Sequence, residues 1–201
     1  MGNIWFTADL HLGHARIIQY CGRPFEDKID HDNTLISNWN SVVQKGDTIY
    51  LLGDLAFGSP QWIMDKLVGR LKGKICLVKG NHDKSVTKEP LCRRFEFIKD
   101  VHMLTTQCKG KRHQFWLSHY AHLSWPQANY GVIHLFGHSH SRLNGVGKSM
   151  DVGVDTNNFF PYSLETIIDL MEQKESHVTI KVVSEEERWK PKTPEEKHKA
   201  I

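Results

Sequence analysis

The sequence predicts an α/β fold whose sheets are covered by helices, and three observations lead to this prediction. Short apolar segments rich in β-branched and aromatic residues recur along the chain, and each ends at glycine or polar residues, as buried strands do. Helical patterns stand between several of these segments. The chain has 201 residues, 39% of them hydrophobic and 24% charged, which suits one globular domain and excludes a disordered protein.

The expected strands begin early in the chain and continue to its last quarter. They are 4–8, 48–53, 74–80, 95–105, 113–119, 132–138 and 150–155. Because helical patterns separate the early strands and follow the last one, we expect helices on the faces of the sheets.

Three helices are expected from apolar periodicity and from capping residues. Residues 30–43 repeat apolar side chains every three or four positions, which is the spacing of one helix face. Pro60 suits the first position of a second helix, whose apolar positions continue to Leu71. Ser163 is expected to cap a third helix over 164–174.

We expect a single domain over residues 1–183, followed by a charged C-terminal tail. The composition changes after residue 183, and 184–201 is rich in charge and proline. Such a segment offers little apolar surface to bury, so it is expected to be solvated rather than packed.

Charge and cysteine content restrict the compartment and the partners. The net charge of +3 and the isoelectric point near 8.6 admit a phosphate-bearing ligand. They leave nucleic acid possible but do not indicate it, because nucleic-acid binders usually have a clustered basic face. The four cysteines are far apart in the sequence, which favours free thiols in a reducing compartment. No signal-peptide pattern and no apolar run near the ~18–20 residues of a membrane span is found, so we expect a cytoplasmic protein without a membrane partner.

Polar side chains follow five of the expected strands, at the point where each strand ends. They are Asp9 and His11; Asp54; Asn81, His82 and Asp83; His119; and His138 and His140. Catalytic groups of α/β folds gather at strand ends. Carboxylate and imidazole without thiolate suit Mn²⁺, Fe, Zn²⁺ or Ni²⁺, and there are more ligands here than one tetrahedral ion can use. The pattern therefore indicates a cluster of two metal ions.

The order of these motifs resembles the calcineurin-like metallophosphoesterase superfamily. The motifs D-x-H, G-D, G-N-H-D, H and G-H-x-H follow one another between Asp9 and His140, and 150–167 is similar to the end of small bacterial and phage members. The resemblance implies a four-layer αββα sandwich, in which two sheets pack together between helices.

The resemblance also implies a role for each polar residue. It assigns one metal ion to Asp9, His11 and His140, a second to Asn81, His119 and His138, and a bridging position to Asp54. It makes His82 the catalytic proton donor and Asp83 the residue that orients the His82 imidazole. A metal-bridging hydroxide would attack phosphorus in line while His82 protonates the leaving oxygen. Among divalent ions the resemblance favours Mn²⁺, with Fe, Zn²⁺ and Ni²⁺ as alternatives.

Weaker signals mark residues near these motifs as candidate substrate contacts. His14 could bind substrate phosphate, and Arg16 and Arg23 could supply positive charge at the mouth of the site. Tyr120 and His122 flank His119 and could shape the pocket. The alternative for each is a loop or surface residue.

Three classes of function remain open on these residues. A metal-dependent phosphoesterase is favoured, because His82 and the ligand set are complete. The alternatives are an inactive scaffold of the same fold and a nucleic-acid-binding module. For an enzyme of this length we expect a small phosphate ester or nucleotide as substrate, and a phosphodiester rather than a phosphomonoester. Nothing in the sequence identifies the physiological substrate, the native metal or the oligomeric state.

Overall fold

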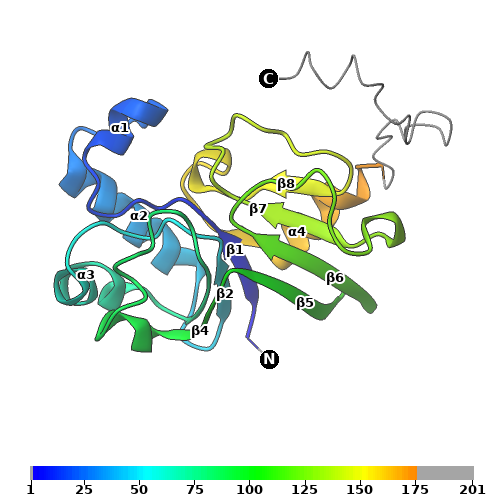
Figure 1. The fold of residues 1–201 in the computed structure, drawn as a ribbon, viewed down its shortest axis with the longest axis horizontal. Helices are drawn as coiled ribbons and strands as arrows, with labels where there is room; N and C mark the ends of the chain where they lie inside the picture. The colour runs from blue at the N-terminus through cyan, green and yellow to red at the C-terminus, as the bar shows by residue number, and fades with distance from the viewer. Residues whose placement is uncertain (1, 176–201) are drawn as a thin grey trace, which may run out of the picture.

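The computed structural model, which describes residues 2–175, contains two mixed β-sheets (Figure 1). The first sheet has the order β4-β3-β2-β1-β9. Its strands are β1 (Ile4–Thr7), β2 (Thr48–Leu51), β3 (Lys74–Val78), β4 (Phe95–Lys99) and β9 (Tyr162–Ser163). The second sheet has the order β5-β6-β7-β8. Its strands are β5 (Val101–Cys108), β6 (Lys111–Ser118), β7 (Ile133–Phe136) and β8 (Ser149–Asp151).

In both sheets, the strands that precede the sequence motifs are parallel to one another. Strands β1 to β4 are parallel, and β9 joins β1 in the antiparallel direction. In the second sheet β6, β7 and β8 are parallel, and β5 is antiparallel to β6. The carboxyl ends of β1, β2 and β3 therefore lie at one edge of the first sheet, and those of β6 and β7 lie at one edge of the second.

The helices are α1 (Arg16–Cys21), α2 (Lys28–Val42), α3 (Pro60–Lys66) and α4 (Leu164–Glu172). Short 3₁₀ turns cover Val68–Arg70, Leu91–Arg94, Ala128–Tyr130 and Val154–Thr156. Side-chain caps explain three of the helix starts: the side chain of Asp27 accepts from two backbone N–H groups of α2, Ser59 caps α3, and Ser163 caps α4. No helix among the described residues has the length and apolar character needed to cross a membrane.

Two hydrophobic clusters hold the elements together. The first places Trp39 of α2 and Ile63 of α3 against the β2 and β3 residues that face these helices. The second joins the sheets, with Phe6 of β1 close to Phe115 of β6 at 5.5 Å between ring centroids. Helix α4 adds Ile167 to this second cluster. Burial of apolar surface in the second cluster thus fixes one sheet against the other.

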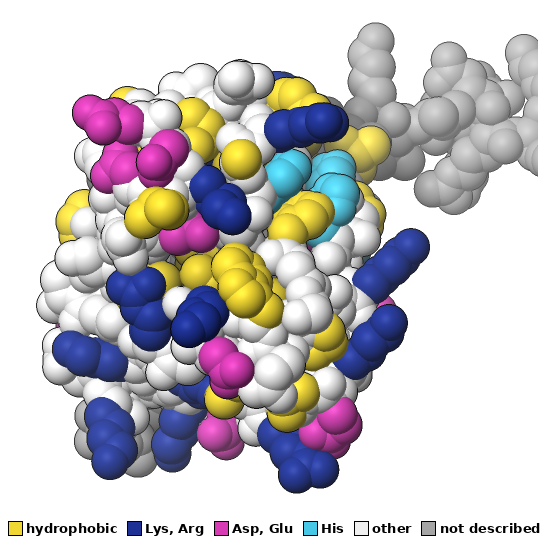
Figure 2. Space-filling model, turned by 90° about the vertical axis from the view of Figure 1, so that its left-hand side faces the viewer, with side chains coloured by type: hydrophobic (Ala, Val, Ile, Leu, Met, Phe, Trp, Pro, Cys, Tyr) yellow, Lys and Arg dark blue, Asp and Glu magenta, His cyan; other side chains and the backbone are white. Residues whose placement is uncertain are grey.

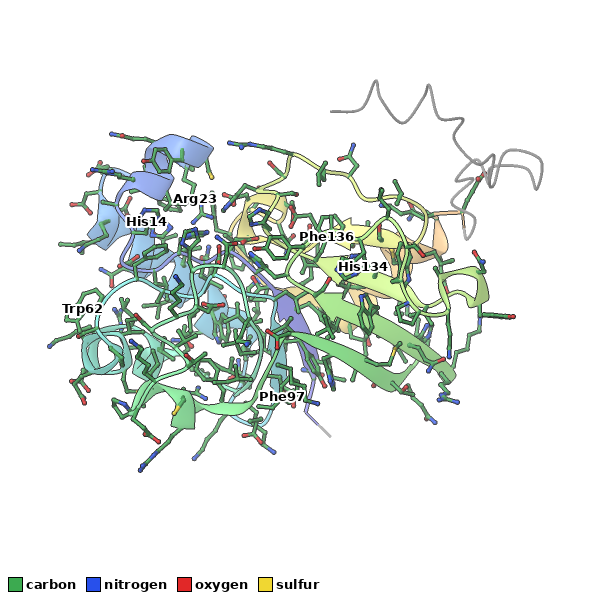
Figure 3. The ribbon with its side chains drawn as sticks, in the orientation of Figure 1. His14, Arg23, Trp62, Phe97, His134 and Phe136 are labelled. Atoms are coloured by element: carbon green, nitrogen blue, oxygen red, sulfur yellow. The ribbon has the colours of Figure 1, made fainter. Side chains whose placement is uncertain are left out.

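The outer face of the second sheet is covered by a loop. His134 of β7 points away from the second cluster (Figure 3). Its cross-strand neighbour Trp116 of β6 does the same, because the alternate residues Phe115 and Leu117 belong to that cluster. His134 and Trp116 are both bonded to His122, and Trp125 lies 5.1 Å from His134 between ring centroids. Residues 120–131, which follow His119, therefore provide the cover of this face.

The predicted α/β class is confirmed, and several boundaries differ from expectation. Residues 95–105 form two strands of different sheets, β4 and β5, because the chain turns at the exposed Asp100. Helix α1 and strand β9 were not expected. The finer αββα arrangement and the single-domain boundary at residue 183 stay predictions, and the expected tail, 184–201, lies outside the described residues.

Candidate metal centre

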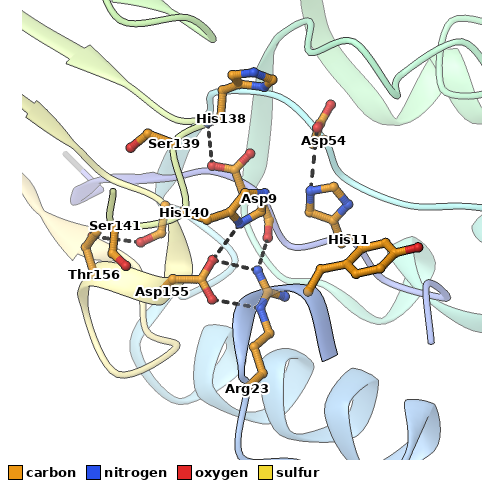
Figure 4. A network of polar contacts seen from close by, with 12 residues as sticks. Asp9, His11, Arg23, Asp54, His138, Ser139, His140, Ser141, Asp155 and Thr156 are labelled. Atoms are coloured by element: carbon orange, nitrogen blue, oxygen red, sulfur yellow. Dashed lines mark hydrogen bonds and ion pairs between the residues drawn. The ribbon is translucent and has the colours of Figure 1, made fainter. Parts of the chain in front are cut away.

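The candidate ligands follow the carboxyl ends of strands from both sheets. Asp9 and His11 follow β1, Asp54 follows β2, His119 follows β6, and His138 and His140 follow β7. The backbone N–H of His138 donates to Asp9 Oδ2 at 2.8 Å, so a direct hydrogen bond joins the two sheets here (Figure 4). The topology therefore brings together side chains that are far apart in the sequence, and Asp9 and His140 are separated by 131 positions (140 − 9).

Two groups of side chains have potential ligand atoms close enough together to bind one cation each. One ligand atom each from Asp9, His11 and His140 lies within 4.8 Å of the others, and we call these three the Asp9 set. Asp54, His119 and His138 meet the same limit and form the Asp54 set. Each set takes residues from both sheets.

The backbone at these residues is left-handed, which is uncommon for residues other than glycine. The φ angles are 57° at Asp9, 52° at His11, 54° at Asp54, 64° at His138 and 47° at His140. Such conformations cost about 1–3 kcal/mol each and persist where the surrounding structure enforces them, often at functional sites. They also replace strand geometry in the D-x-H and H-x-H motifs, so the two side chains of each motif are not restricted to one face of a strand.

His119 shows most directly what the Asp54 set can bind. Its Nδ1 lies 2.7 Å from the Leu52 carbonyl oxygen, which can only accept, so Nδ1 carries the proton and the neutral ring has its lone pair on Nε2. That Nε2 lies 3.0 Å from Asn81 Oδ1 and 3.6 Å from Asp54 Oδ2. In the neutral form of the ring, all three atoms carry lone pairs and none carries a hydrogen. A cation satisfies all three at once.

Asp54 lies between the two sets. Its Oδ2 is 3.5 Å from His11 Nε2, in addition to the 3.6 Å that separates it from His119 Nε2. Its Oδ1 accepts from the backbone N–H of His82 at 2.9 Å. One carboxylate oxygen thus faces both groups of candidate ligands, which is the position of a shared ligand.

The Asp9 set contains buried polar atoms that have no hydrogen-bond partner in the described part of the chain. Asp9 Oδ1 and both ring nitrogens of His11 are buried and lack hydrogen-bond partners among the described residues. Burial, together with the neighbouring Asp151 and Asp54 carboxylates, raises the pKa of Asp9 well above its usual value. Burial and the nearby His140 ring lower the pKa of His11 to about 2. Unpaired buried polar atoms are costly, and carboxylate oxygen with neutral imidazole is a ligand set that divalent first-row metals accept. The residues present therefore fit a metal ion.

His82 and Asp83 do not form the pair that the resemblance implies. The Asp83 carboxylate is buried and accepts from the backbone N–H groups of Gly80, Asp54 and Leu55 at 2.7–3.0 Å. Within residues 2–175, no hydrogen bond joins it to the His82 ring. Asp83 instead anchors the loop after β3 to the loop after β2, and the exposed His82 imidazole lies 5.0 Å from the Phe57 ring between centroids.

Of the expected substrate contacts, Arg23 is placed differently from the prediction. It is only 4% exposed and bonds to protein groups, so it does not supply charge at the mouth of the site. His14 stacks on Phe57 at 4.2 Å, and Arg16 is exposed on α1. Tyr120 packs against His138 at 4.7 Å and is 48% exposed.

His122 lies over the outer face of the second sheet, where it accepts from the indole N–H of Trp116. His122 therefore holds the loop against this sheet, and within residues 2–175 its hydrogen bonds go to Trp116 and His134 and to none of the candidate metal ligands. Tyr120, in contrast, packs against His138 and so borders the candidate ligands.

Two carboxylates of the network were not predicted. Asp155 lies 2.8 Å from His140 Nδ1 (Figure 4). Asp151 accepts from Ser139 and from the backbone N–H of Ser141. Both occur in 150–155, which reads as a strand in the sequence. Asp151 ends β8, whereas Asp155 stands in the 3₁₀ turn that follows. Their signal was the pair of acidic residues at the second and last positions of that apolar run.

Cys21 Sγ, His140 and Asp155 also lie within 4.8 Å of one another. Arg23 donates to both Asp155 carboxylate oxygens, at 2.7 and 2.8 Å. Its positive charge compensates this carboxylate and opposes a cation there. The two sets defined above are therefore the better metal candidates.

Comparison with known proteins identified relatives along most of the chain, although no family model matches it. The uncharacterized protein MJ1445 of Methanocaldococcus jannaschii is 33% identical over 181 residues, covering 86% of this chain and 93% of the relative. The gene 66 protein of Mycobacterium phage D29 is 30% identical over 164 residues, covering 71% and 81%, respectively.

Solved structures give a corresponding result. The protein of unknown function AQ665 from Aquifex aeolicus matches with a TM-score of 0.65 and 25% identity, over 85% of this chain and 100% of the other. A novel archaeal phosphodiesterase matches with a TM-score of 0.41 and 18% identity, which is too low to bear on fold or activity.

Proposed function

We propose that this chain, which belongs to the same family as MJ1445 and the phage D29 gene 66 protein, is a metal-dependent phosphoesterase. The observation that carries the proposal is the meeting of His119 Nε2, Asn81 Oδ1 and Asp54 Oδ2 without a hydrogen between them. Lone pairs this close repel one another unless a proton or a metal ion lies between them, and the oxygen and imidazole nitrogen atoms suit divalent metals.

In this proposal, the Asp9 set holds one divalent ion, Asn81 with the His119 and His138 rings holds a second, and Asp54 contacts both. Mn²⁺ is the favoured ion. Bound divalent ions supply positive charge to the phosphate oxygens and acidify a water molecule. The exposed imidazole of His82, next to these ligands, is the candidate general acid for the leaving oxygen.

A phosphodiester is the favoured substrate class, and the placement of Arg23 supports this choice. A phosphomonoester dianion carries more negative charge than a diester, and so gains more from cationic side chains at the site. The guanidinium of Arg23 is buried and paired with Asp155, so it does not serve this purpose. The exposed Arg16 on α1 stays a candidate for this purpose.

The face of the molecule drawn in Figure 2 also favours an enzyme over a nucleic-acid-binding module. In Figure 2, lysine and arginine side chains are dispersed and acidic side chains stand among them, whereas histidines reach the surface beside hydrophobic side chains. Nucleic-acid binders typically gather their basic residues on one face or stripe.

The test combines metal content with hydrolysis of two chromogenic esters. We expect metal-free protein to take up two Mn²⁺ per chain, and then to hydrolyse bis(4-nitrophenyl) phosphate faster than 4-nitrophenyl phosphate. Asp54→Asn should lose activity and at least one Mn²⁺, because the carboxylate that offsets repulsion between the ions is gone. The control Asp169→Asn, on α4, should match the wild type. Mn²⁺ uptake without hydrolysis of either ester would instead support the inactive scaffold, and no uptake would contradict the proposal.

A further inference from the structure

Arg23 uses its whole hydrogen-bonding capacity inside the protein. Its Nε and Nη2 donate to the two carboxylate oxygens of Asp155 at 2.7 and 2.8 Å, and Nη2 also donates to the Asp9 carbonyl at 2.8 Å. Nη1 donates to the Leu10 carbonyl at 3.1 Å and to His31 Nε2 at 2.8 Å. A guanidinium has five N–H donors, and these contacts use all of them. Arg23 is therefore a fixed structural cation behind the centre.

The carboxylate that Arg23 holds contacts a candidate metal ligand. Asp155 Oδ2 lies 2.8 Å from His140 Nδ1, and the Asp155 side chain is 8% exposed (Figure 4). Because a carboxylate accepts, Nδ1 of His140 carries the proton and the lone pair of the neutral ring is on Nε2. A hydrogen bond of this kind fixes ring orientation and makes the free nitrogen a better donor to a metal.

The two candidate sets differ at this point. In the Asp54 set, His119 is oriented by a neutral group, the Leu52 carbonyl. In the Asp9 set, His140 is oriented by the charged carboxylate of Asp155. A carboxylate partner increases the basicity of an imidazole more than a carbonyl does, so the two sets should not bind a cation equally.

We propose that Asp155 is a positioning residue that acts through His140 to strengthen metal binding at the Asp9 set, with Arg23 holding Asp155 in place. The inference rests on the proposed function only in that it takes the two sets as metal sites. It adds that the sites are unequal and assigns the difference to one carboxylate. It also gives Arg23 a role behind the site instead of at its mouth.

The experiment is calorimetric titration of metal-free protein with Mn²⁺, which is independent of activity. Wild type should show two unequal dissociation constants. Asp155→Asn should raise one of them by ~10–100-fold, as loss of an outer-sphere partner typically does, and change the other less than ~3-fold. Asp155→Glu, which keeps the charge, should recover part of the loss. The control Asp169→Asn replaces a carboxylate that pairs with Lys109 elsewhere on the molecule and should change neither constant.

A double-mutant cycle separates positioning from a general structural role. If Asp155 acts through His140, then Asp155→Asn should have no further effect on Mn²⁺ binding in a His140→Ala background. An equal additional loss in that background would overturn the inference, although both sites would still be metal sites. No Mn²⁺ binding by wild type would instead refute the proposed function.

A measurement on the wild type covers the case in which Asp155→Asn does not fold. Nitrogen-15 NMR of the metal-free chain should show His140 as the Nδ1–H tautomer, with the signal assigned by its loss in His140→Ala. The opposite tautomer would contradict the role of Asp155.

Discussion

The imidazole of His82 is exposed beside the candidate ligands, and a hydrogen bond from the His82 backbone N–H holds the residue in place. The His82 N–H donates to Asp54 Oδ1 at 2.9 Å, and the ring lies beside those of Phe57 and His11. This arrangement leaves the ring free to exchange a proton with a bound ligand. It also ties the position of His82 to the carboxylate that faces both sets.

We therefore expect His82→Asn to keep both metal ions and to lose activity selectively. For a phosphodiester with a poor leaving group, kcat should fall ~10²–10⁴-fold, because the leaving oxygen needs a proton. For a 4-nitrophenyl ester the fall should be much smaller. Steady-state kinetics on both esters, with metal analysis, checks this. Equal losses together with a missing ion would make His82 a ligand.

A second histidine, His134, is buried neutral on the outer face of the second sheet (Figure 3). Its Nδ1–H donates to the Trp116 carbonyl and its Nε2 accepts from the backbone N–H of His122. Burial lowers the pKa of His134 to about 4. The unfolded chain, with a histidine pKa near ~6.5, binds the proton first on acidification.

The contribution of His134 to stability should therefore be complete above about pH 6.5 and decline as the pH falls toward 4. Over the whole window the loss is on the order of 3 kcal/mol, at 1.36 kcal/mol per pKa unit. Urea unfolding at pH 7 and pH 5 should show a smaller difference for His134→Gln than for wild type. An equal difference in both proteins would assign the pH dependence to other groups.

At the scale of elements, glycines allow the loops after β2 and β3 to approach each other. A Cβ built on Gly80 would lie 2.2 Å from Asp54 Oδ1 and 2.7 Å from the Asp54 backbone nitrogen. A Cβ on Gly53, whose φ is +91°, would lie 2.4 Å from His119 Nδ1. The G-D and G-N-H-D motifs thus need glycine because the side chains of the Asp54 set occupy that space.

Gly80→Ala should accordingly weaken Mn²⁺ binding and destabilise the fold by about 1–3 kcal/mol, as overpacking usually does. Gly46→Ala is the matched control, since nothing lies within 4 Å of the added methyl group, and it should stay within about 0.5 kcal/mol of wild type. Calorimetric Mn²⁺ titration and urea unfolding measure both effects. Normal Mn²⁺ binding by Gly80→Ala would show that the loops can move apart without disturbing Asp54.

The elements also show what the sequence could predict. Pro60 at a helix start and the cap at Ser163 are local signals, and both helices begin as expected. The β4–β5 boundary could not be found, because 95–105 is one apolar run and only pairing with different sheets separates the strands. Helix α1 is six residues long and carries too little periodicity to be seen.

The same distinction applies to the candidate centre. The sequence motifs identified the candidate ligands, and the structure brings these residues close together. The sequence could not predict the roles of Arg23 and Asp155, because their contact spans 132 residues and depends on how the turn after β8 meets the end of α1. Partners held only by tertiary contact leave no local pattern in a single sequence.

At the scale of the whole molecule, the candidate centre lies where the two sheets meet. The Asp9 set takes two residues from the first sheet and one from the second, and the Asp54 set takes one and two. Without a cation, buried acceptor atoms face one another across this junction. A bound ion would therefore join elements that otherwise adhere through the second hydrophobic cluster.

Metal should consequently raise the melting temperature. An ion at a hundredfold excess over its dissociation constant stabilises the native state by ~2.7 kcal/mol, and ~2–4 °C per kcal/mol is typical for a chain of this length. We expect Mn²⁺ to raise the melting temperature of metal-free protein by roughly 5–10 °C, and Asp54→Asn to show a smaller rise. Scanning calorimetry with EDTA and then with Mn²⁺ measures it. A melting temperature indifferent to both additions would argue against a metal junction.

The origin of each set in both sheets also has a consequence for the time course of folding. Neither set is complete until the sheets have docked, so an ion cannot assist the early steps in which each sheet forms its own pairs. It acts on the docked state. Where docking follows the transition state, such an interaction slows unfolding without changing the folding rate. The ion would then extend the lifetime of the native chain and leave its folding rate unchanged. The centre would thus contribute kinetic stability at the junction of the sheets.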